Sequence, residues 1–276
     1  MQSKTLIVVG MHRSGTSLIT NWLYRCGLQV GECLVEAQPS NIEGHFEDVE
    51  FLKIHEEILA SNNVNLAGLI HHKELDISVY QLAKLKSVID IKDQRYKQWG
   101  WKEPRTCLFL DIYQELIPGS KYLVILRDYP SVTTSLLKRD FAEVEKIQLR
   151  RKLFKRLLWK YFRRDRKQSK FYQQNAGHFL KVWIEYNEHI LNLLKGLHPD
   201  DYAVINYSVL QKNDQQIFSF LTKTWGFMLQ YFPFNEVYKE HLMGRPIDLT
   251  LCIKDAALLM KAEQIQREFK KYMKAY

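Results

Sequence analysis

The stretch Gly-Met-His-Arg-Ser-Gly-Thr-Ser at residues 10–17 has the residue types and spacing of a loop that could bind phosphate. It follows the apolar run Leu-Ile-Val-Val at 6–9 and precedes an apolar helical pattern, so a strand and a helix should flank it. Successive backbone N–H groups of such a loop point at one spot, where the helix N-terminus adds partial positive charge. The candidate phosphate-binding residues are Arg13, Ser14, Gly15, Thr16 and Ser17.

The loop has the spacing of a Walker A motif, Gly-x4-Gly-Lys-Ser/Thr, with one departure. Thr16 occupies the position of the lysine that reaches the β- and γ-phosphates of a nucleoside triphosphate. The missing lysine argues against an ordinary ATPase or kinase, and Arg13 supplies a cation within the loop instead. A nucleotide kinase with an atypical phosphate loop and a non-catalytic nucleotide-binding protein stay open as alternatives.

A second arginine follows another apolar strand pattern. The run Tyr-Leu-Val-Ile-Leu at 122–126 is typical of a buried strand, and Arg127 comes directly after it. Ligands of open α/β sheets bind at the carboxyl ends of the strands. Arginine suits an anion there, because its planar fork can give two parallel hydrogen bonds to a tetrahedral group. The chain therefore offers two anion sites, each at the carboxyl end of a predicted parallel strand.

These two stretches resemble the sulfotransferases that use 3′-phosphoadenosine 5′-phosphosulfate (PAPS). Residues 10–17 are similar to the family's 5′-phosphosulfate loop, usually Pro-Arg-Ser-Gly-Thr-Thr/Ser, with His12 at the proline position. Residues 123–135 resemble its 3′-phosphate motif, in which an arginine at a strand end and a serine eight positions later bind the phosphate. Arg127 and Ser135 keep that spacing. The resemblance implies PAPS as co-substrate, whose two anionic groups need two anion sites.

Two further segments resemble the same family. Residues 204–210, Val-Ile-Asn-Tyr-Ser-Val-Leu, are similar to its later Tyr-Glu-Asp-Leu segment, which implies that Tyr207 lies beside the nucleotide. Residues 99–105, Trp-Gly-Trp-Lys-Glu-Pro-Arg, resemble the Lys-Asp-Pro element of the tyrosylprotein and bacterial branches and single out Lys102. The matches follow the family's order along the chain.

The reaction that this resemblance implies is transfer of a sulfuryl group from PAPS to a hydroxyl or amine of an acceptor, such as a carbohydrate or another small molecule. Like phosphoryl transfer, it is in-line and depends on positioning and charge stabilisation. We assign stabilisation of the leaving phosphate to Arg13, the loop amides and Lys102. Lys102 could also give a proton to the bridging oxygen.

A general base must take the acceptor's proton, and several side chains after the first predicted helix are candidates. The segment at 41–48 resembles the bacterial branch, which favours Glu47. An alternative alignment with a one-residue gap matches Glu32 to the Gly-Glu-Glu of the tyrosylprotein enzymes and places Cys33 at the position of their catalytic acid, so Glu32 is a second candidate. His45 is a further candidate, because the ordinary pKa of histidine lies near neutrality. The other acids of this cluster are Glu43 and Asp48.

Alternating strand and helix patterns must position these residues. Strands are predicted at about 5–9, 99–104, 122–126 and 202–207. Helices are predicted at about 16–25, 47–60, 78–92, 106–116, 174–197, 213–225 and 254–274. This order predicts an α/β fold, P-loop-like and three-layered, with helices flanking a central parallel sheet. Without a repeat or a flexible linker, residues 1–276 are expected to form one sulfotransferase domain, with an additional basic helical section at 138–198.

The positive charge of the chain is concentrated in that section. The net charge is +9, and residues 138–170 contain 14 Lys/Arg and 4 Asp/Glu. Three interpretations fit: an amphipathic helix packed on the domain, a cationic wall that attracts an anionic acceptor such as a glycan, or a helix in peripheral contact with a membrane. Without a nucleic-acid motif, no nucleic-acid partner is expected. The apolar residues that recur at helical spacing there are Ile147, Leu153, Phe154, Leu157, Leu158, Tyr161 and Phe162.

Composition excludes several other classes. A chain of 276 residues with 46% hydrophobic content can form one large α/β domain. It has no run of 18 apolar residues and no secretory signal pattern, so we expect neither a membrane span nor export. The four cysteines lack CxxC spacing and fit a reducing cytoplasm. We expect no metal, because no His/Cys cluster has ligand spacing.

Overall fold

The computed structural model describes residues 3–36, 44–71, 74–150, 152–239 and 244–274. Its strands there are β1 (Lys4–Val9), β2 (Gln98–Lys102), β3 (Lys121–Ile125) and β4 (Tyr202–Ile205). They form a parallel sheet in the order β2-β1-β3-β4. Because β1 and β3 are neighbours and run in the same direction, the segments that follow them leave the same edge of the sheet.

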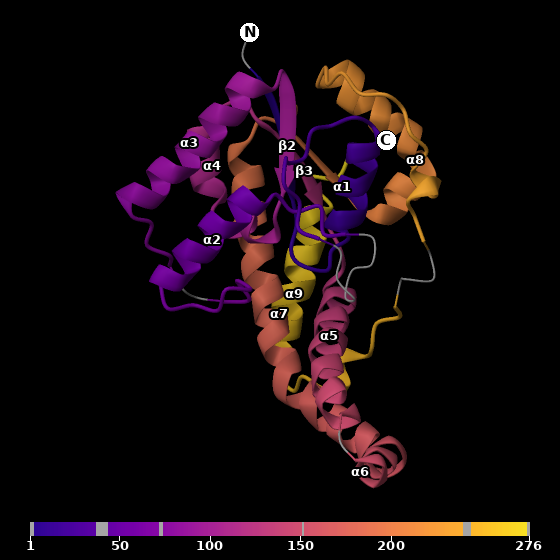
Figure 1. Ribbon diagram of the computed structural model, residues 1–276. Helices are drawn as coiled ribbons and strands as arrows, with labels where there is room; N and C mark the ends of the chain where they lie inside the picture. Colours follow the sequence, from indigo (N-terminus) through magenta and orange to yellow (C-terminus); the bar gives the residue numbers. More distant parts are fainter. Residues whose placement is uncertain (1–2, 37–43, 72–73, 151, 240–243, 275–276) are drawn as a thin grey trace.

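The side chains of β1 alternate between two hydrophobic cores, which makes the fold three-layered. Leu6 and Val8 belong to the core beneath α1 (Thr16–Arg25) and α8 (Tyr207–Ser219). Ile7 and Val9 belong to the larger core on the other face. The helices of that face are α2 (Val49–Ser61), α3 (Val79–Arg95), α4 (Leu110–Leu116), α5 (Tyr129–Leu149), α7 (Arg164–Gly196) and α9 (Ala256–Phe269). The predicted α/β fold, a parallel sheet flanked by helices, is confirmed (Figure 1).

The basic section forms a long helical hairpin. α5 leads away from the sheet, and α7 packs along it on the return (Figure 1). At the far end lie α6 (Leu153–Leu158) and a π-helical turn at Trp159–Arg163. The section is helical as predicted, but α7 begins at Arg164 rather than near 174. In the part of the chain that the structure describes, no helix has both the length and the apolar character needed to cross a bilayer.

Other predicted helix boundaries also differ from the structure. A helical turn precedes the helix expected from 213: α8 begins at Tyr207, because the side chain of Asn206 accepts a hydrogen bond from the Val209 N–H and caps it, and α8 is kinked at Asn213, whose backbone is non-helical. Tyr207 therefore stands in a first helical turn, not in a strand. A 3₁₀ helix at Pro104–Leu108 precedes α4, where one helix was expected over 106–116. The remaining short elements are a π-helical turn at Phe220–Thr224 and 3₁₀ turns at Phe234–Glu236 and Leu249–Leu251.

Candidate active site

The predicted phosphate loop joins β1 to α1 and folds against the end of β3. Gly10 is required there: a Cβ atom would lie 2.7 Å from Thr16 Cγ2 and 2.8 Å from the carbonyl oxygen of Ile125. Gly15 precedes α1 with φ +93°, a left-handed conformation that glycine adopts without strain. Within the described ranges no side chain caps α1. Since the first amides of a helix have no intrahelical acceptor, those of α1 are available to an anion.

Arg13 connects the loop to the second predicted anion site. Its Nε donates to Ser135 Oγ on α5 at 2.9 Å. Arg127 follows β3, and its guanidinium donates to the Arg13 carbonyl oxygen at 2.8 Å. The Nε atom of Arg127 is buried and has no hydrogen-bond partner among the residues described. The structure thus brings the two predicted anion sites into direct contact, and it places the Arg13 side chain on the Arg127 side of the loop.

A basic cavity of about 370 Å³ lies at this junction. Burial, together with the positive charges of Arg139 and Arg127, lowers the pKa of Arg13. The lowered pKa means that the buried positive charges repel one another, so a bound anion would be stabilised here. Residues on one face of α5, missed by the sequence analysis, share the cavity with the predicted arginines. The cavity is lined by Arg13, Arg127, Ser131, Thr134, Ser135, Lys138, Arg139, Ala142, Glu143, Lys146 and Gly244.

Tyr207, which the resemblance predicts to lie beside the nucleotide, is next to the phosphate loop. A Cβ atom on Gly15 would be 3.9 Å from its ring carbon Cδ1. The guanidinium carbon of Arg127 lies 5.9 Å from the ring centroid, and the ring stacks on Tyr238 at 6.2 Å. The tyrosine therefore offers an aromatic surface between the loop and the basic cavity.

Lys102 ends β2 on the other side of the loop and is fully buried. Its Nζ donates to Ser17 Oγ at 3.2 Å, to Glu47 Oε1 at 2.9 Å and to the His45 carbonyl oxygen. Burial lowers the pKa of Lys102, and the charge of Glu47 opposes that shift. A buried lysine whose pKa is lowered gives up its proton more readily than an exposed one. The structure thus brings together Ser17, Lys102 and Glu47, which were predicted from separate segments.

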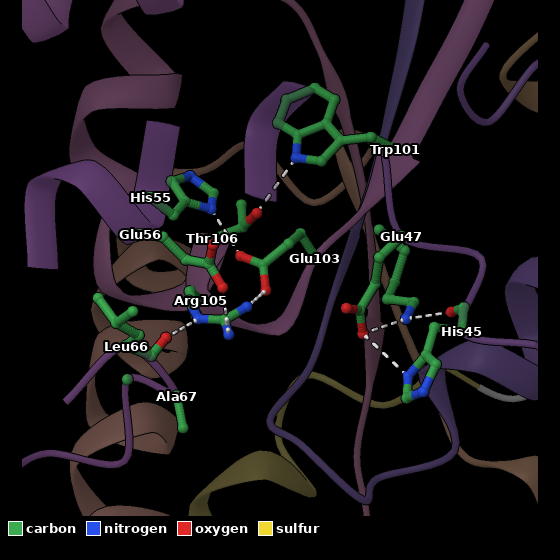
Figure 2. A network of polar contacts seen from close by, with 12 residues as sticks. His45, Glu47, His55, Glu56, Leu66, Ala67, Trp101, Glu103, Arg105 and Thr106 are labelled. Atoms are coloured by element: carbon green, nitrogen blue, oxygen red, sulfur yellow. Dashed lines mark hydrogen bonds and ion pairs between the residues drawn. The ribbon is translucent and has the colours of Figure 1, made fainter. Parts of the chain in front are cut away.

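His45 is the other titratable side chain at this cluster. Its Nδ1 lies 3.9 Å from Glu47 Oε1, and Figure 2 shows the two side chains facing each other. Burial lowers the pKa of His45, with Glu47 opposing the shift. Its Nε2 atom is buried without a partner in the described part of the chain. The imidazole is therefore favoured in its neutral form, which can accept a proton.

A buried polar network supports the strand that carries Lys102 (Figure 2). Glu103 Oε2 lies 2.6 Å from His55 Nδ1, and Glu103 Oε1 accepts from Arg105 at 2.5 Å. Although burial opposes it, the contact with His55 and the charge of Arg105 lower the pKa of Glu103 to about 2. His55 Nε2 in turn lies 2.7 Å from the Tyr113 hydroxyl. Every member of this network is partnered, which fixes the backbone next to Lys102.

The other predicted base candidates have structural partners or lie elsewhere. Asp48 caps α2 through the Glu50 N–H and pairs with buried Lys92 at 2.8 Å. Glu32 is paired with Arg95 at 2.7 Å and accepts from the Tyr96 hydroxyl at 3.0 Å. Glu43 lies outside the described residues. Among the titratable groups the structure describes here, Glu47 and His45 are the ones that adjoin Lys102.

Comparison with known proteins identifies the fold. No family model and no curated protein matches the chain. A sulfotransferase domain from the curacin biosynthetic pathway is similar in structure, with a TM-score of 0.53 and 14% identity over 97% of this chain and 98% of its own. A sulfotransferase from Mycobacterium avium gives a TM-score of 0.55 and 14% identity over 98% of this chain and 76% of its own. The chain therefore has the sulfotransferase fold, and the side chains at its sheet edge must carry any conclusion about activity.

Proposed function

We propose that this protein transfers a sulfuryl group from PAPS to a hydroxyl or amine acceptor. The observation that carries the proposal is the contact between the phosphate loop and the Arg127–Ser135 pair at one edge of the sheet. A nucleoside with anionic groups at both its 5′ and 3′ positions needs two neighbouring anion sites of this kind. The sulfotransferase fold of the chain agrees with this assignment.

The residues at the site fit the two ends of such a nucleotide. The uncapped start of α1 offers backbone amides to the 5′ phosphosulfate. The basic cavity offers the unpartnered Nε of Arg127 and the Ser135 hydroxyl to the 3′-phosphate. Arg13 stands between them, with its backbone in the loop and its guanidinium in the cavity. Tyr207 provides a flat surface for the nucleoside between the two ends.

Lys102 and Glu47 are proposed to transfer the two protons of the reaction, one to the leaving phosphate and one from the acceptor. PAPS supplies the activated sulfuryl group, so the protein must stabilise charge on the leaving phosphate and accept the proton of the acceptor. Lys102 Nζ can give a proton to the leaving oxygen, and Glu47 can take one from the acceptor. The 2.9 Å hydrogen bond between them lets the proton pass from Glu47 back to Lys102, which restores both groups.

The acceptor is proposed to be a carbohydrate or another small molecule with a hydroxyl or amine group. Cationic side chains of α5, among them Lys138, Arg139 and Lys146, line the cavity next to the loop. Because the cavity itself is assigned to the 3′-phosphate, these cations would act on the acceptor at longer range and attract one that is itself anionic, such as an acidic glycan. An acceptor screen with PAPS, scored by release of adenosine 3′,5′-bisphosphate, tests this directly.

Calorimetry with adenosine 3′,5′-bisphosphate tests the nucleotide site. The wild type should bind, and Arg127→Ala should weaken binding about 100-fold, because each hydrogen bond between charged groups contributes about 1.5–3 kcal/mol. Arg267→Ala, on an exposed arginine of α9, serves as the matched control and should bind like the wild type. Failure of the wild type to bind refutes the proposal, and magnesium-dependent binding of ATP in its place would indicate a kinase.

A second pair of variants separates catalysis from binding. Lys102→Ala and Glu47→Ala should bind adenosine 3′,5′-bisphosphate nearly as the wild type does, but should form product at least ~100-fold more slowly. Nucleotide binding by a wild type that forms no product with any acceptor would indicate a non-catalytic binding protein. Unchanged product formation in both variants would contradict the roles assigned to this pair.

A further inference from the structure

The far end of the helical hairpin exposes large apolar side chains to solvent. We call this end the helical tip: the last turn of α5, α6 and the π-helical turn, residues 147–150 and 152–163. One interpretation of the sequence was that the apolar residues of this section pack onto the domain. Most of the apolar side chains of the helical tip are instead exposed. The exposed fractions are 60% for Ile147, 51% for Leu149, 67% for Leu153, 78% for Phe154, 46% for Leu157, 67% for Tyr161 and 78% for Phe162.

Buried aromatic contacts anchor the helical tip to the hairpin. Its exposed side chains therefore do not contribute to this packing. Trp159 is only 5% exposed and stacks on Phe141 of α5 with ring centroids 6.2 Å apart. Phe141 also contacts Phe171 of α7 at 5.7 Å. Arg164 and Glu145 form an ion pair at 2.6 Å across the base of the tip. These contacts hold the π-helical turn that follows α6 against the hairpin, while Phe154, Tyr161 and Phe162 stay exposed to solvent.

The same surface is strongly cationic. The sequence from Ile147 to Arg163 contains seven Lys/Arg and no Asp/Glu. This charge disfavours a second copy of the tip as the partner, because like charges would meet. The exposed aliphatic side chains distinguish the tip from a nucleic-acid surface, which needs cations and stacking aromatics. The exposed and described cations are Arg150, Lys152, Arg156, Lys160 and Arg163.

We infer that the helical tip docks the protein on a bilayer with anionic headgroups. Exposed Phe and Leu side chains flanked by Lys and Arg have the chemistry of an interfacial helix: the apolar groups enter the headgroup boundary while the cations meet anionic lipids. α5 has 21 residues and leads from the sheet to the tip (Figure 1), so the phosphate loop would stand roughly 30 Å from the surface. The basic cavity lies along α5 between them, from Ser131 to Lys146. This inference does not depend on the proposed function.

Vesicle co-sedimentation tests the inference with the full chain. Vesicles of phosphatidylcholine mixed with phosphatidylserine should bind the wild type, and binding should weaken as salt is raised. Vesicles of phosphatidylcholine alone should bind it far less. The double variant Arg156→Gln/Lys160→Gln should lose at least tenfold in partitioning, since each cation near an anionic surface contributes about fivefold. Lys270→Gln, an exposed cation on the C-terminal side of α9, is the matched control.

The decisive variant leaves the charge unchanged. Phe154→Ala/Phe162→Ala should reduce partitioning about tenfold, whereas Tyr80→Ala, a 66% exposed aromatic on α3, should not. Equal binding to neutral and anionic vesicles, no binding at all, or full binding by the phenylalanine variant would each overturn the inference. Concentration-dependent self-association that this variant abolishes would assign the surface to a second copy instead. Nucleotide affinity should stay unchanged in all tip variants, so a failure here is distinct from a failure of the proposed function.

Discussion

One set of variants can test how the buried ion pair between Lys102 and Glu47 contributes to stability and to the proposed reaction. Glu47→Gln removes the negative charge and leaves the fully buried ammonium with neutral oxygen acceptors only: the new amide, Ser17 Oγ and the His45 carbonyl. Breaking a buried pair from one side typically costs 3–5 kcal/mol. The Glu47 side chain is 12% exposed and keeps some contact with water, so we expect a loss of roughly 3 kcal/mol in the free energy of unfolding.

Removing both charges should reverse much of that loss. In Lys102→Met/Glu47→Gln no charge is left buried: methionine fills about the volume of the lysine without a charge, and the amide at position 47 keeps some contact with water. Urea denaturation of the wild type, both single variants and the double variant gives the coupling energy, which should be about 2 kcal/mol. Product formation should stay at least ~100-fold below the wild type in the double variant, because stability returns but the proton donor and acceptor do not.

The exposed pair Arg267–Glu263, at 2.8 Å on α9, is the matched control for this cycle. Its side chains are 67% and 53% exposed, and its coupling energy should stay below about 0.5 kcal/mol. A coupling energy between Lys102 and Glu47 no larger than that of the control would refute the structural part of the argument. Recovery of product formation in the double variant would refute the chemical part.

Three further outcomes follow from named contacts. Arg139→Ala should weaken binding of adenosine 3′,5′-bisphosphate by about tenfold in calorimetry, since its charge faces the cavity that Arg127 lines; unchanged affinity would remove Arg139 from the site. Gly10→Ala should cost about 1–3 kcal/mol in urea denaturation and abolish nucleotide binding, because its Cβ would clash with the Ile125 carbonyl. The pKa of Glu103 falls from 4.5 to about 2 on folding, so it contributes about 3 kcal/mol above pH 4.5 that is lost as the pH falls toward 2. Glu103→Gln should flatten the pH dependence of unfolding in that window, and an unaltered slope would contradict the assignment.

Three of the strands, β1, β3 and β4, were predictable because each is a short and mostly apolar run that is buried on both faces. β1, β3 and β4 agree with the predicted ranges within two residues, and the glycine loop fixes where α1 begins. Helix starts failed where a capping side chain decided them. Asn206 begins α8 immediately after β4, and the apolar periodicity at 213–225 does not contain that information. The periodicity of apolar residues predicts whether a segment is a helix or a strand. The residue at which a helix begins depends on a single capping hydrogen bond.

The cationic wall of the cavity could have been found from spacing alone. Ser131, Lys138, Arg139 and Lys146 lie four, three, four and eleven positions from Ser135, so they share one face of α5 with this predicted phosphate ligand. The orientation of the Arg13 side chain could not have been predicted from spacing. It results from a positive φ of 70°, which turns the guanidinium toward Ser135 rather than toward the start of α1.

The hydrogen-bond and ion-pair partners of the candidate general bases distinguish them in a way that the sequence does not. Sequence spacing placed four acids and a histidine near the first helix without ranking them by environment. In the structure Asp48 caps a helix and neutralises Lys92, and Glu32 pairs with an exposed arginine, so the charge of each already stabilises a local structure. Glu47 instead contacts the buried lysine that also reaches the phosphate loop through Ser17. In the proposed reaction, Glu47 can exchange a proton with Lys102, whose pKa burial lowers, through the hydrogen bond that joins them. The carboxylate of Asp48 already neutralises buried Lys92, so its protonation would destabilise the fold.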